Sequence, residues 1–386
     1  MPATKKVLFL THVGDPGGAE YKMIDLCRSV RDSAEVMLFQ HGSLEAILCR
    51  HRIKYSVTPM PPATSQVRKE GGVMSLLRAV PGTLSMVRSV VREGSRFDVV
   101  VCFSQKSFVI ASLAKPFMRR PIVWFMNDIL SPSHFSRALI WLLVTLSRYS
   151  ADRIALNSHA SLDVWLGAGG RKRGVSVIYP GVHEDQIASQ LKHPECIAAH
   201  RKKYSPDGRP LIGMFGRISR WKGQDVFLRA IAKVPNVKAV IVGEALFAEE
   251  DHERHIRDLA RELGIEERVV FAGHVDDVMA LMAACDVVAH CSTAPEPFGL
   301  VIAEAMLAGT PVIASDAGGA REIVIPNETG LLTPLKDHDA LAHAIERCLA
   351  DTQWSKELSR KAKTRAQRKF TGAAMTAGFL EILETF

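Results

Sequence analysis

The sequence predicts an α/β protein made of two doubly wound domains, each built around a parallel sheet. Short apolar runs rich in β-branched residues alternate with amphipathic stretches of helical length, which is the pattern of βα units. The chain has 386 residues, of which 47% are hydrophobic and 23% charged, so it holds enough apolar material for two cores. A polar, turn-rich stretch separates two sets of expected strands.

The first set has six expected strands, at residues 5–13, 35–41, 98–103, 121–126, 153–158 and 175–180. The second has five, at residues 210–216, 237–243, 268–273, 286–291 and 311–316. We therefore expect a first domain over 1–185, a linker over 186–208, a second domain over 209–370 and a terminal helix over 371–386. Ligands of open parallel sheets bind beyond the carboxyl ends of the strands, so the loops there are the places to search for a site.

Composition indicates a cytoplasmic protein that does not cross a membrane. The seven cysteines are odd in number and form no CxxC pair, which argues against a disulfide framework or a structural zinc site. The apolar run near the N-terminus is too short for a signal peptide and is expected to be the first strand. The longest apolar run, 139–146, is less than half of the roughly 20 residues that span a bilayer.

The net charge of +8 is concentrated in the first half of the chain. Residues 1–186 hold 24 basic and 14 acidic residues, whereas 187–386 hold 25 and 27. Arg88, Arg92 and Arg96 recur every four residues and are expected to share one helix face. Two interpretations remain open: a face held on anionic lipid, or a solvated basic surface. Nucleic acid is disfavoured as a partner because the basic residues are not interleaved with aromatic ones.

A glycine-rich turn, GDPGGAEYKM, follows the first expected strand and opens a helix. Gly17 and Gly18 would allow the backbone to approach an anion at the free N–H groups of the helix N-terminus. A tight turn without a ligand is the alternative. A nicotinamide cofactor is disfavoured because the second strand ends in Gln40 and His41, not in the acid that would hold a ribose.

The second domain opens with a turn that carries two cations, in GRISRWKGQDVFLRA. Arg217 and Lys222 lie five residues apart before an amphipathic helix, after Gly216 at the end of the strand. The planar guanidinium of Arg217 and the ammonium of Lys222, close to a helix start, can together bind the several oxygens of a diphosphate. The alternative is an ordinary solvated basic turn.

Two carboxylates lie eight residues apart in PEPFGLVIAEA, with Glu296 in a loop and Glu304 inside an apolar segment. We expect a helix over 300–307 that begins at Gly299 and stops at Gly309. Phosphate oxygens would accept from its first N–H groups, and Glu304 would accept from a pair of sugar hydroxyls. An unpaired buried carboxylate is costly, so Glu304 should reach solvent or such a partner.

The remaining motifs argue against a metal site and against two classes of enzyme. The DHD of 337–339 begins a helical stretch, so Asp337 is expected to cap a helix and not to bind a metal. No GxSxG elbow and no GKS/T loop occurs in the sequence, which disfavours hydrolase and kinase functions.

These motifs together resemble the retaining glycosyltransferases of family 4. The resemblance is carried by GRISRWKGQDVFLRA, the E-x7-E of EPFGLVIAE, AMLAGTPVIASDAGGAREIV and the N-terminal GGAE. It implies a GT-B fold, with two Rossmann-like domains facing across a cleft and a terminal helix that crosses back to the first domain. It further implies transfer of a hexose-type sugar, with retention, from a nucleotide-diphosphate sugar to a glycan, glycolipid or lipid-linked acceptor. No metal or other cofactor is implied.

The resemblance also assigns roles. Arg217 and Lys222 would hold the diphosphate and stabilise the leaving group, Glu296 would contact the donor sugar, and Glu304 would bind the ribose. Asp128 and Asn127 stand where many relatives carry a histidine near the donor sugar, so Asp128 is a further catalytic candidate and Asn127 a sugar-side one. The remaining donor-binding candidates are Gly17, Gly18, Gly216, Gly243, Glu244, His274, Val275, Phe298, Gly299, Leu300 and Val301.

Two other functions stay open on the sequence alone. One is a nucleotide-sugar epimerase of the same architecture, which would need no acceptor. The other is a non-catalytic scaffold that binds a sugar nucleotide or a membrane without turnover.

Overall fold

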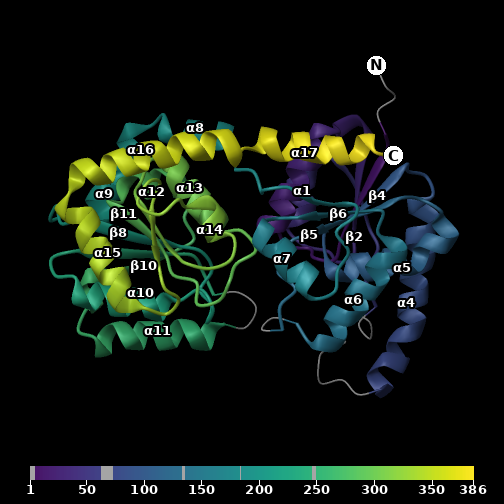
Figure 1. Cartoon of the computed structure of the whole chain (residues 1–386), viewed down its shortest axis with the longest axis horizontal. Coiled ribbons are helices and arrows are strands. Elements are labelled where there is room, and N and C mark those ends of the chain that lie inside the picture. Colours follow the sequence, from purple (N-terminus) through teal and green to yellow (C-terminus); the bar gives the residue numbers. More distant parts are fainter. Residues whose placement is uncertain (1–4, 62–72, 133–134, 183, 246–248) are drawn as a thin grey trace. The chain divides into compact units, whose positions relative to one another are not determined.

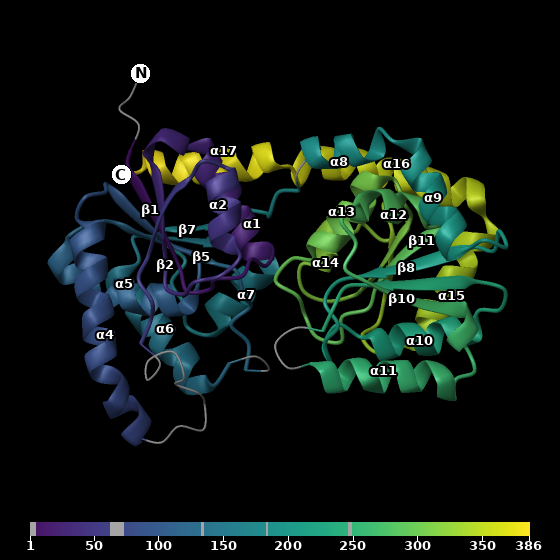
Figure 2. The ribbon, with the colours of Figure 1, turned by 180° about the vertical axis from the view of Figure 1, so that it is seen from behind.

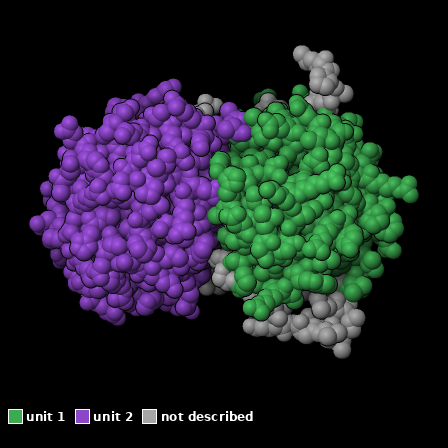
Figure 3. All heavy atoms as spheres, in the orientation of Figure 1, with its two compact units in different colours: residues 1–179, 375–386 green, residues 180–374 purple. Residues whose placement is uncertain are grey.

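The computed structural model describes residues 5–61, 73–132, 135–182, 184–245 and 249–386. The chain divides into two compact units, one formed by Met1–Tyr179 with Met375–Phe386 and the other by Pro180–Ala374 (Figure 3). Each unit is an α/β body with a single all-parallel sheet.

Among the described residues, the sheet of unit 1 has seven parallel strands in the order β3-β2-β1-β4-β5-β6-β7. The strands β2, β4, β5 and β6 can be followed in Figure 1. Its strands are β1 (Val7–Thr11), β2 (Ala34–Leu38), β3 (Lys54–Val57), β4 (Val99–Cys102), β5 (Ile122–Met126), β6 (Arg153–Leu156) and β7 (Val175–Val177). The strand order reverses direction between β1 and β4, and the crevice at such a switch point is the usual ligand site of an open sheet.

Helices cover both faces of this sheet, and β1 shows how the residues divide between them. Alternate side chains of a strand point to opposite faces, so Leu8 and Leu10 join a core under α4, α5 and α6, whereas Val7 and Phe9 join a core under α1, α2 and α17. The helices of unit 1 are α1 (Gly18–Ser29), α2 (Leu44–Arg50), α4 (Val73–Gly94), α5 (Gln105–Met118), α6 (Arg137–Ser150), α7 (His159–Gly167) and α17 (Gly372–Glu384).

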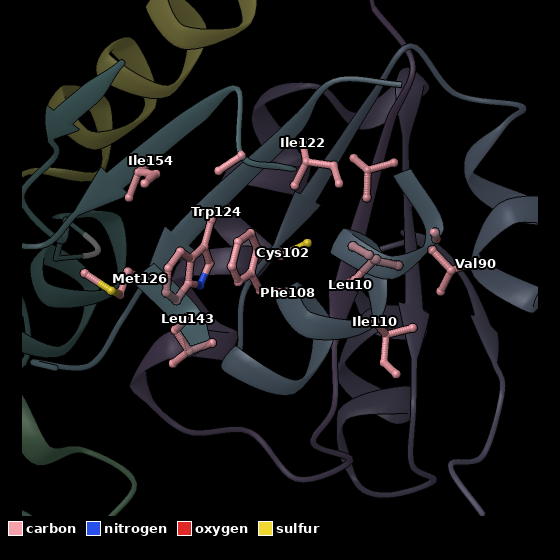
Figure 4. Packing of buried hydrophobic residues seen from close by; sticks show 14 of the residues in the cluster. Leu10, Val90, Cys102, Phe108, Ile110, Ile122, Trp124, Met126, Leu143 and Ile154 are labelled. Atoms are coloured by element: carbon pink, nitrogen blue, oxygen red, sulfur yellow. The ribbon is translucent and has the colours of Figure 1, made fainter. Parts of the chain in front are cut away.

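Two aromatic clusters fill these cores. On the first face, the Trp124 ring of β5 stacks on Phe108 of α5 (Figure 4), with a centroid distance of 4.1 Å. Trp165 of α7 meets the Trp124 ring edge-on at 6.0 Å. On the second face, Phe379 of α17 contacts Phe9 and Phe125, at centroid distances of 5.8 and 6.1 Å. The C-terminal helix is therefore part of the core of unit 1.

Among the described residues, the sheet of unit 2 has six parallel strands in the order β10-β9-β8-β11-β12-β13. The strands β8, β10 and β11 can be followed in Figure 2. Its strands are β8 (Leu211–Phe215), β9 (Lys238–Val242), β10 (Val269–Gly273), β11 (Val287–His290), β12 (Val312–Ser315) and β13 (Leu331–Thr333). The strands β8, β9, β11 and β12 are almost wholly buried, as expected for a sheet that is covered on both faces.

The helices of unit 2 pack on both faces of its sheet. Side chains of α10, α11 and α15 share one apolar core, while α9, α12, α13 and α16 contact one another. The helices are α8 (Glu184–Leu191), α9 (Pro194–Tyr204), α10 (Gln224–Lys233), α11 (Glu250–Glu262), α12 (Val278–Ala284), α13 (Leu300–Ala308), α14 (Ala320–Ile323), α15 (His338–Ala350) and α16 (Thr352–Lys369).

All eleven expected strands are present, and the two strands that the sequence did not predict are edge strands. β3 reads KYSV and is only partly buried, and β13 has three residues. Neither has the long apolar run that marks a central strand, because an edge strand is covered less completely.

The predicted linker over 186–208 is largely helical. α9 packs on α12, His200 Nε2 lies 2.8 Å from Asp277, and Arg201 pairs with Asp286 at 2.5 Å. Its polar residues therefore have partners in unit 2, which composition alone did not indicate. Among the described residues no helix is long and apolar enough to span a bilayer, and the apolar run of 139–146 lies within α6.

Candidate functional site

The carboxyl ends of three neighbouring strands of unit 2 finish in glycines. Gly216, Gly243 and Gly273 follow or end β8, β9 and β10, and all three have a positive φ. A Cβ atom on Gly243 would lie 2.2 Å from the carbonyl oxygen of Gly216, so only glycine fits there. The loops that carry Arg217, Glu244 and His274 therefore leave the sheet side by side.

The Lys222 turn is fixed to the end of β11. A Cβ atom on Gly223, which has φ of 79°, would lie 2.0 Å from the carbonyl oxygen of Cys291. The backbone N–H of Thr293 donates to the carbonyl of Trp221 at 2.8 Å. Lys222 Nζ lies 4.4 Å above the Trp221 ring, so the position of its charge is set by an aromatic surface as well as by the turn.

Glu296 is the centre of a buried polar network. Its side chain is 8% exposed, and its Oε1 accepts from Lys222 Nζ at 2.6 Å, from His290 Nε2 at 2.9 Å and from the Ser292 hydroxyl. Burial by itself raises the pKa of Glu296, but the charges of Lys222 and His290 and their hydrogen bonds outweigh it and hold the pKa well below its ordinary value. Glu296 is therefore an anion at neutral pH, suited to accept hydrogen bonds and not to donate a proton.

The loop that carries Glu296 rests on the glycine pair of AGGAR. The N–H of Gly319 donates to the Glu296 carbonyl at 3.0 Å, and a Cβ atom on Gly318 would lie 2.4 Å from that same carbonyl oxygen. The two glycines thus let two backbones touch, which fixes the backbone beneath the Glu296 carboxylate.

Helix α13 begins and ends at the predicted glycines. Gly299 precedes it with φ of 107° and Gly309 ends it in the left-handed conformation. Phe298 is buried beside Phe370, whereas Leu300 and Val301 of the first turn are partly exposed. Glu304 is half-buried, in line with the expectation that it reaches solvent or a partner, and the buried carboxylate is Glu296 of the loop before α13.

The other predicted donor-binding residues of unit 2 lie at the same edge of the sheet. Arg217, Glu244 and His274 are exposed and Val275 is half-buried. The backbone N–H of Ile218 donates to the Glu244 carbonyl at 3.0 Å, which joins the loops after β8 and β9. Farther along the chain, Asp337 caps α15 by accepting from Ala340 N–H at 2.8 Å, as the sequence predicts.

In unit 1 the predicted glycine turn opens α1. Gly17 precedes the helix with an extended backbone, and its N–H donates to Glu20 Oε2 at 3.0 Å. Glu20 also accepts from Thr11, and burial raises its pKa. The Glu20 carboxylate thus accepts the hydrogen bond of one N–H group at the start of α1. The sequence led us to expect an anionic ligand there, at Gly17 and Gly18.

Asn127 and Asp128 follow β5, and the structure separates their surroundings. Asp128 is exposed and accepts from the Gln105 amide. Asn127 is half-buried, and its Oδ1 accepts from Lys22 Nζ at 2.6 Å. Lys22 Nζ also donates to Asn157 Oδ1 at 3.2 Å.

Sequence reasoning missed four of these polar residues: Lys22, Asn157, His290 and Ser292. A signal was present for three of them, because Asn157, His290 and Ser292 stand at the end of, or directly after, a buried strand, where ligands of parallel sheets bind. Lys22 gave no such signal, since a lysine in an amphipathic helix is normally on its solvated side.

The three predicted lipid-facing arginines do not share one helix. Arg88 and Arg92 are exposed on α4, but α4 ends at Gly94, so Arg96 lies beyond it. A Cβ atom on Gly94 would lie 2.2 Å from Met118 Sδ, so the end of α4 packs closely on α5. Arg92 and Arg96 both pair with Glu93, at 3.0 and 2.5 Å.

Both halves of the chain match family models. Residues 16–186 match the model described as Glycosyltransferase Family 4, and residues 197–368 match that of Glycosyl transferases group 1. The crystal structure of Anabaena Alr3699/HepE in complex with UDP-glucose is similar over 99% of this chain and 100% of that chain, with a TM-score of 0.88 and 36% identity. The same Anabaena protein is also known with UDP and with UDP and glucose.

More distant relatives agree on the fold. WaaG, a glycosyltransferase involved in lipopolysaccharide biosynthesis, is 17% identical with a TM-score of 0.70 and covers 96% of this chain and 98% of that chain. These likenesses confirm the predicted fold class, with two Rossmann-like parallel sheets of the GT-B type.

Curated relatives match over a shorter stretch. The lipopolysaccharide core biosynthesis glycosyltransferase LpsE of Rhizobium meliloti is 30% identical over 188 residues, which is 48% of this chain and 54% of LpsE. A GDP-mannose-dependent alpha-(1-6)-phosphatidylinositol monomannoside mannosyltransferase of Mycolicibacterium smegmatis is 31% identical over 213 residues, 52% of this chain and 54% of that protein. The chain spans about half the length of the curated relatives it matches.

Proposed function

Since the chain belongs to glycosyltransferase family 4 and is a GT-B glycosyltransferase that acts on nucleotide sugars, we propose that it transfers a hexose, with retention, from a nucleotide diphosphate to a glycan or lipid-linked acceptor. UDP-glucose is the donor we propose first, because the Anabaena protein that is 36% identical over its whole length binds UDP-glucose.

The observation that carries the proposal is the buried Lys222–Glu296–His290 network at the carboxyl end of β11. Lys222 Nζ donates to Glu296 and lies over the Trp221 ring, so its remaining N–H groups are available to a diphosphate. Arg217 lies five residues before Lys222 in the same loop after β8 and is exposed. A fixed ammonium stabilises the charge that develops on a departing diphosphate, which is the largest electrostatic contribution to such a reaction.

The other residues take roles that fit their places. Glu296, an anion held by three donors, accepts hydroxyls of the donor sugar through its second carboxylate oxygen. The first N–H groups of α13, at Phe298, Gly299, Leu300 and Val301, hold phosphate oxygens, and the half-buried Glu304 takes the ribose hydroxyls. The loops of Gly243, Glu244, His274 and Val275 surround the base.

We further propose that the reaction needs no metal ion. Lys222 and Arg217 supply the positive charge that a metal would otherwise bring to the diphosphate. Activity that is unchanged by excess chelator would support this, and activity that appears only after a divalent cation is added would contradict it.

The test of the donor site is a thermal-shift screen of the full chain against UDP, GDP, ADP and UDP-glucose, repeated on Lys222→Ala. A ligand at a hundred times its Kd adds about 2.7 kcal/mol of stability. We expect UDP-glucose to raise the Tm of the wild type and not of Lys222→Ala. A shift that survives in Lys222→Ala would remove Lys222 from the diphosphate site.

For the acceptor we propose a lipid-linked molecule, reached from an anionic membrane surface through the outer side of α4, α5 and α6. Seven of the ten large apolar side chains that are exposed among the described residues belong to these helices. Phe117, Trp141 and Tyr149 are 72%, 69% and 82% exposed. Among the described side chains of these helices the exposed basic residues are Arg88, Arg92, Lys106, Arg137 and Arg148, against one acidic residue, Glu93. Apolar and cationic side chains thus occur on the same helices, as in an interfacial surface.

Vesicle sedimentation tests this surface. We expect binding to vesicles with anionic lipid at low salt, weakened at high salt and by Trp141→Ser combined with Tyr149→Ser. Leu380→Ser, an exposed apolar side chain on α17 of the same unit, is the matched control. Equal binding by all variants, or no binding at low salt, would refute the membrane surface and leave the donor site untouched.

A further inference from the structure

A buried lysine in unit 1 has no role in the sites described above. Lys22 lies on α1 with its side chain only 5% exposed, and its two hydrogen-bond acceptors are the amide oxygens of Asn127 and Asn157. None of the ion pairs found among the described residues includes Lys22, so its direct partners are these two neutral amide oxygens. A buried ammonium whose hydrogen bonds go only to neutral groups costs stability, which makes such a residue a candidate for function.

The amide groups around Lys22 are locked in one orientation. Asn127 Nδ2 donates to the Phe103 carbonyl at 2.9 Å and, at the longer distance of 3.4 Å, to the Phe125 carbonyl. Asn157 Nδ2 donates to the Asn127 carbonyl at 3.0 Å. Turning either amide over would place an NH2 group against the Lys22 ammonium and a carbonyl against a carbonyl. The cation therefore fixes which side of Asn127 is its donor side.

The position of this group in the fold points to a ligand. Asn127 follows β5 and Asn157 follows β6, at the carboxyl edge of the sheet of unit 1, where ligands of open parallel sheets bind. Asn127 is partly exposed, while Lys22 and Asn157 are buried beneath it. A ligand can reach Asn127 but not Lys22.

We infer that Lys22 is a positioning residue, whose charge holds and polarises the Asn127 amide so that this amide binds a sugar hydroxyl. The inference rests on the proposed function, in which Asn127 lies on the sugar side of the reaction. A cation at the amide oxygen strengthens the amide N–H groups as donors, because hydrogen bonds in a chain polarise one another. An asparagine supported in this way acts as a fixed neutral donor.

The charges around Lys22 determine how pH affects its hydrogen bond to Asn127. Burial lowers the pKa of Lys22 to about 8, and among the described residues the charges that oppose this shift are Asp128, after β5, and Glu20, on α1 itself. His12, after β1, has a pKa lowered to about 4 by burial and by Lys106 of α5, so His12 is neutral at pH 7 to 9. Lys22 is then the group of this cluster that changes charge near pH 8.

The experiment compares the full-length wild type with Lys22→Met, using Lys54→Met as a control for loss of an exposed lysine of the same unit. UDP release from UDP-glucose is followed from pH 6.5 to 9.5. We expect wild-type kcat to fall roughly five- to tenfold as pH rises through 8, because an ammonium is a stronger donor than an amine. Lys22→Met should lose about tenfold at pH 7 and show no further fall through pH 8, while Lys54→Met should match the wild type.

A second variant and a crystal structure make the test independent of the donor. Asn157→Asp places a carboxylate against Lys22 and should move the alkaline fall upward by about one pH unit. In the crystal structure of Lys22→Met, the Asn127 side chain should leave the Phe103 carbonyl. An Asn127 side chain that keeps its orientation there, or a Lys22→Met enzyme with wild-type kcat and the same fall near pH 8, would overturn the inference. Absence of UDP release by the wild type would count against the proposed donor alone, and the orientation of Asn127 would then decide.

Discussion

Replacing Lys22 by methionine should change how the stability of the protein depends on pH. The folded-state pKa of Lys22 is about 8, against 10.5 for an ordinary lysine. The unfolded chain therefore binds more protons than the folded chain between pH 8 and 10.5. Through this residue, the free energy of unfolding of the wild type rises with pH in that window and does not change with pH below pH 8. The difference between these two pKa values corresponds to about 3 kcal/mol of stability across the window.

The assay is equilibrium unfolding in urea at pH 7, 8, 9 and 10, with the free energy of Lys22→Met subtracted from that of the wild type at each pH. Groups that titrate alike in both proteins cancel in this difference. The difference should be flat from pH 7 to 8 and then rise in favour of the wild type by about 1.4 kcal/mol per pH unit. For Lys54→Met, which removes an exposed lysine, the difference should stay flat to pH 10. A flat difference for Lys22→Met as well would refute the claim that Lys22 is buried as a cation without a carboxylate partner.

Four further outcomes follow from unit 2 and from the core of unit 1. Lys222→Met removes the main partner of a buried carboxylate and should cost about 3 to 5 kcal/mol in urea unfolding, with part of the loss restored when Glu296→Gln is added; additive losses would contradict the pairing. Because the folded-state pKa of Glu296 lies below its unfolded value, its stabilisation is present above about pH 4.5 and lost below it. The stability difference between wild type and Glu296→Gln should accordingly shrink on acidification, and a constant difference from pH 7 to 3.5 would argue against it. Gly223→Ala would force a Cβ atom into the Cys291 carbonyl and should lower both Tm and UDP-glucose affinity. The control is Gly208→Ala, at a positive φ with open space around it, which should lower Tm only slightly and leave UDP-glucose affinity unchanged. Phe108→Ala should cost about 3 to 5 kcal/mol by emptying the space against Trp124, measured by the same unfolding assay.

The central strands and the start of α13 were predictable because each depends on a local signal. Buried parallel strands are continuous apolar runs, and Gly299 and Gly309 are needed for backbone conformations that other residues adopt only at a cost. The edge strands β3 and β13 lacked that signal. The helices over 184–204 were hidden by their polar composition, which reflects ion pairs and hydrogen bonds to residues about 75 to 90 positions later.

The sequence allowed us to predict many residues of the candidate site, but not which of them pair or which are buried. Glu296 and Lys222 were found from motif and resemblance, but their direct pairing depends on how the loop before α13 folds under the turn after β8, which spacing does not specify. The burial of Lys22 had no local signal at all. Its two partners lie 105 and 135 residues away, so only the assembled sheet of unit 1 brings them together.

The assignment of α17 to unit 1 has a consequence for how the protein is made. Phe379 covers the rings of Phe9 and Phe125 in the core of unit 1. The ribosome must synthesise all of unit 2, after residue 179, before it synthesises this helix. At about 5 to 20 residues per second, the apolar face of the nascent unit 1 stays open for about 10 to 40 s. That interval is the period in which the chain is exposed to aggregation and to chaperones, and a stop codon before residue 375 would make it permanent.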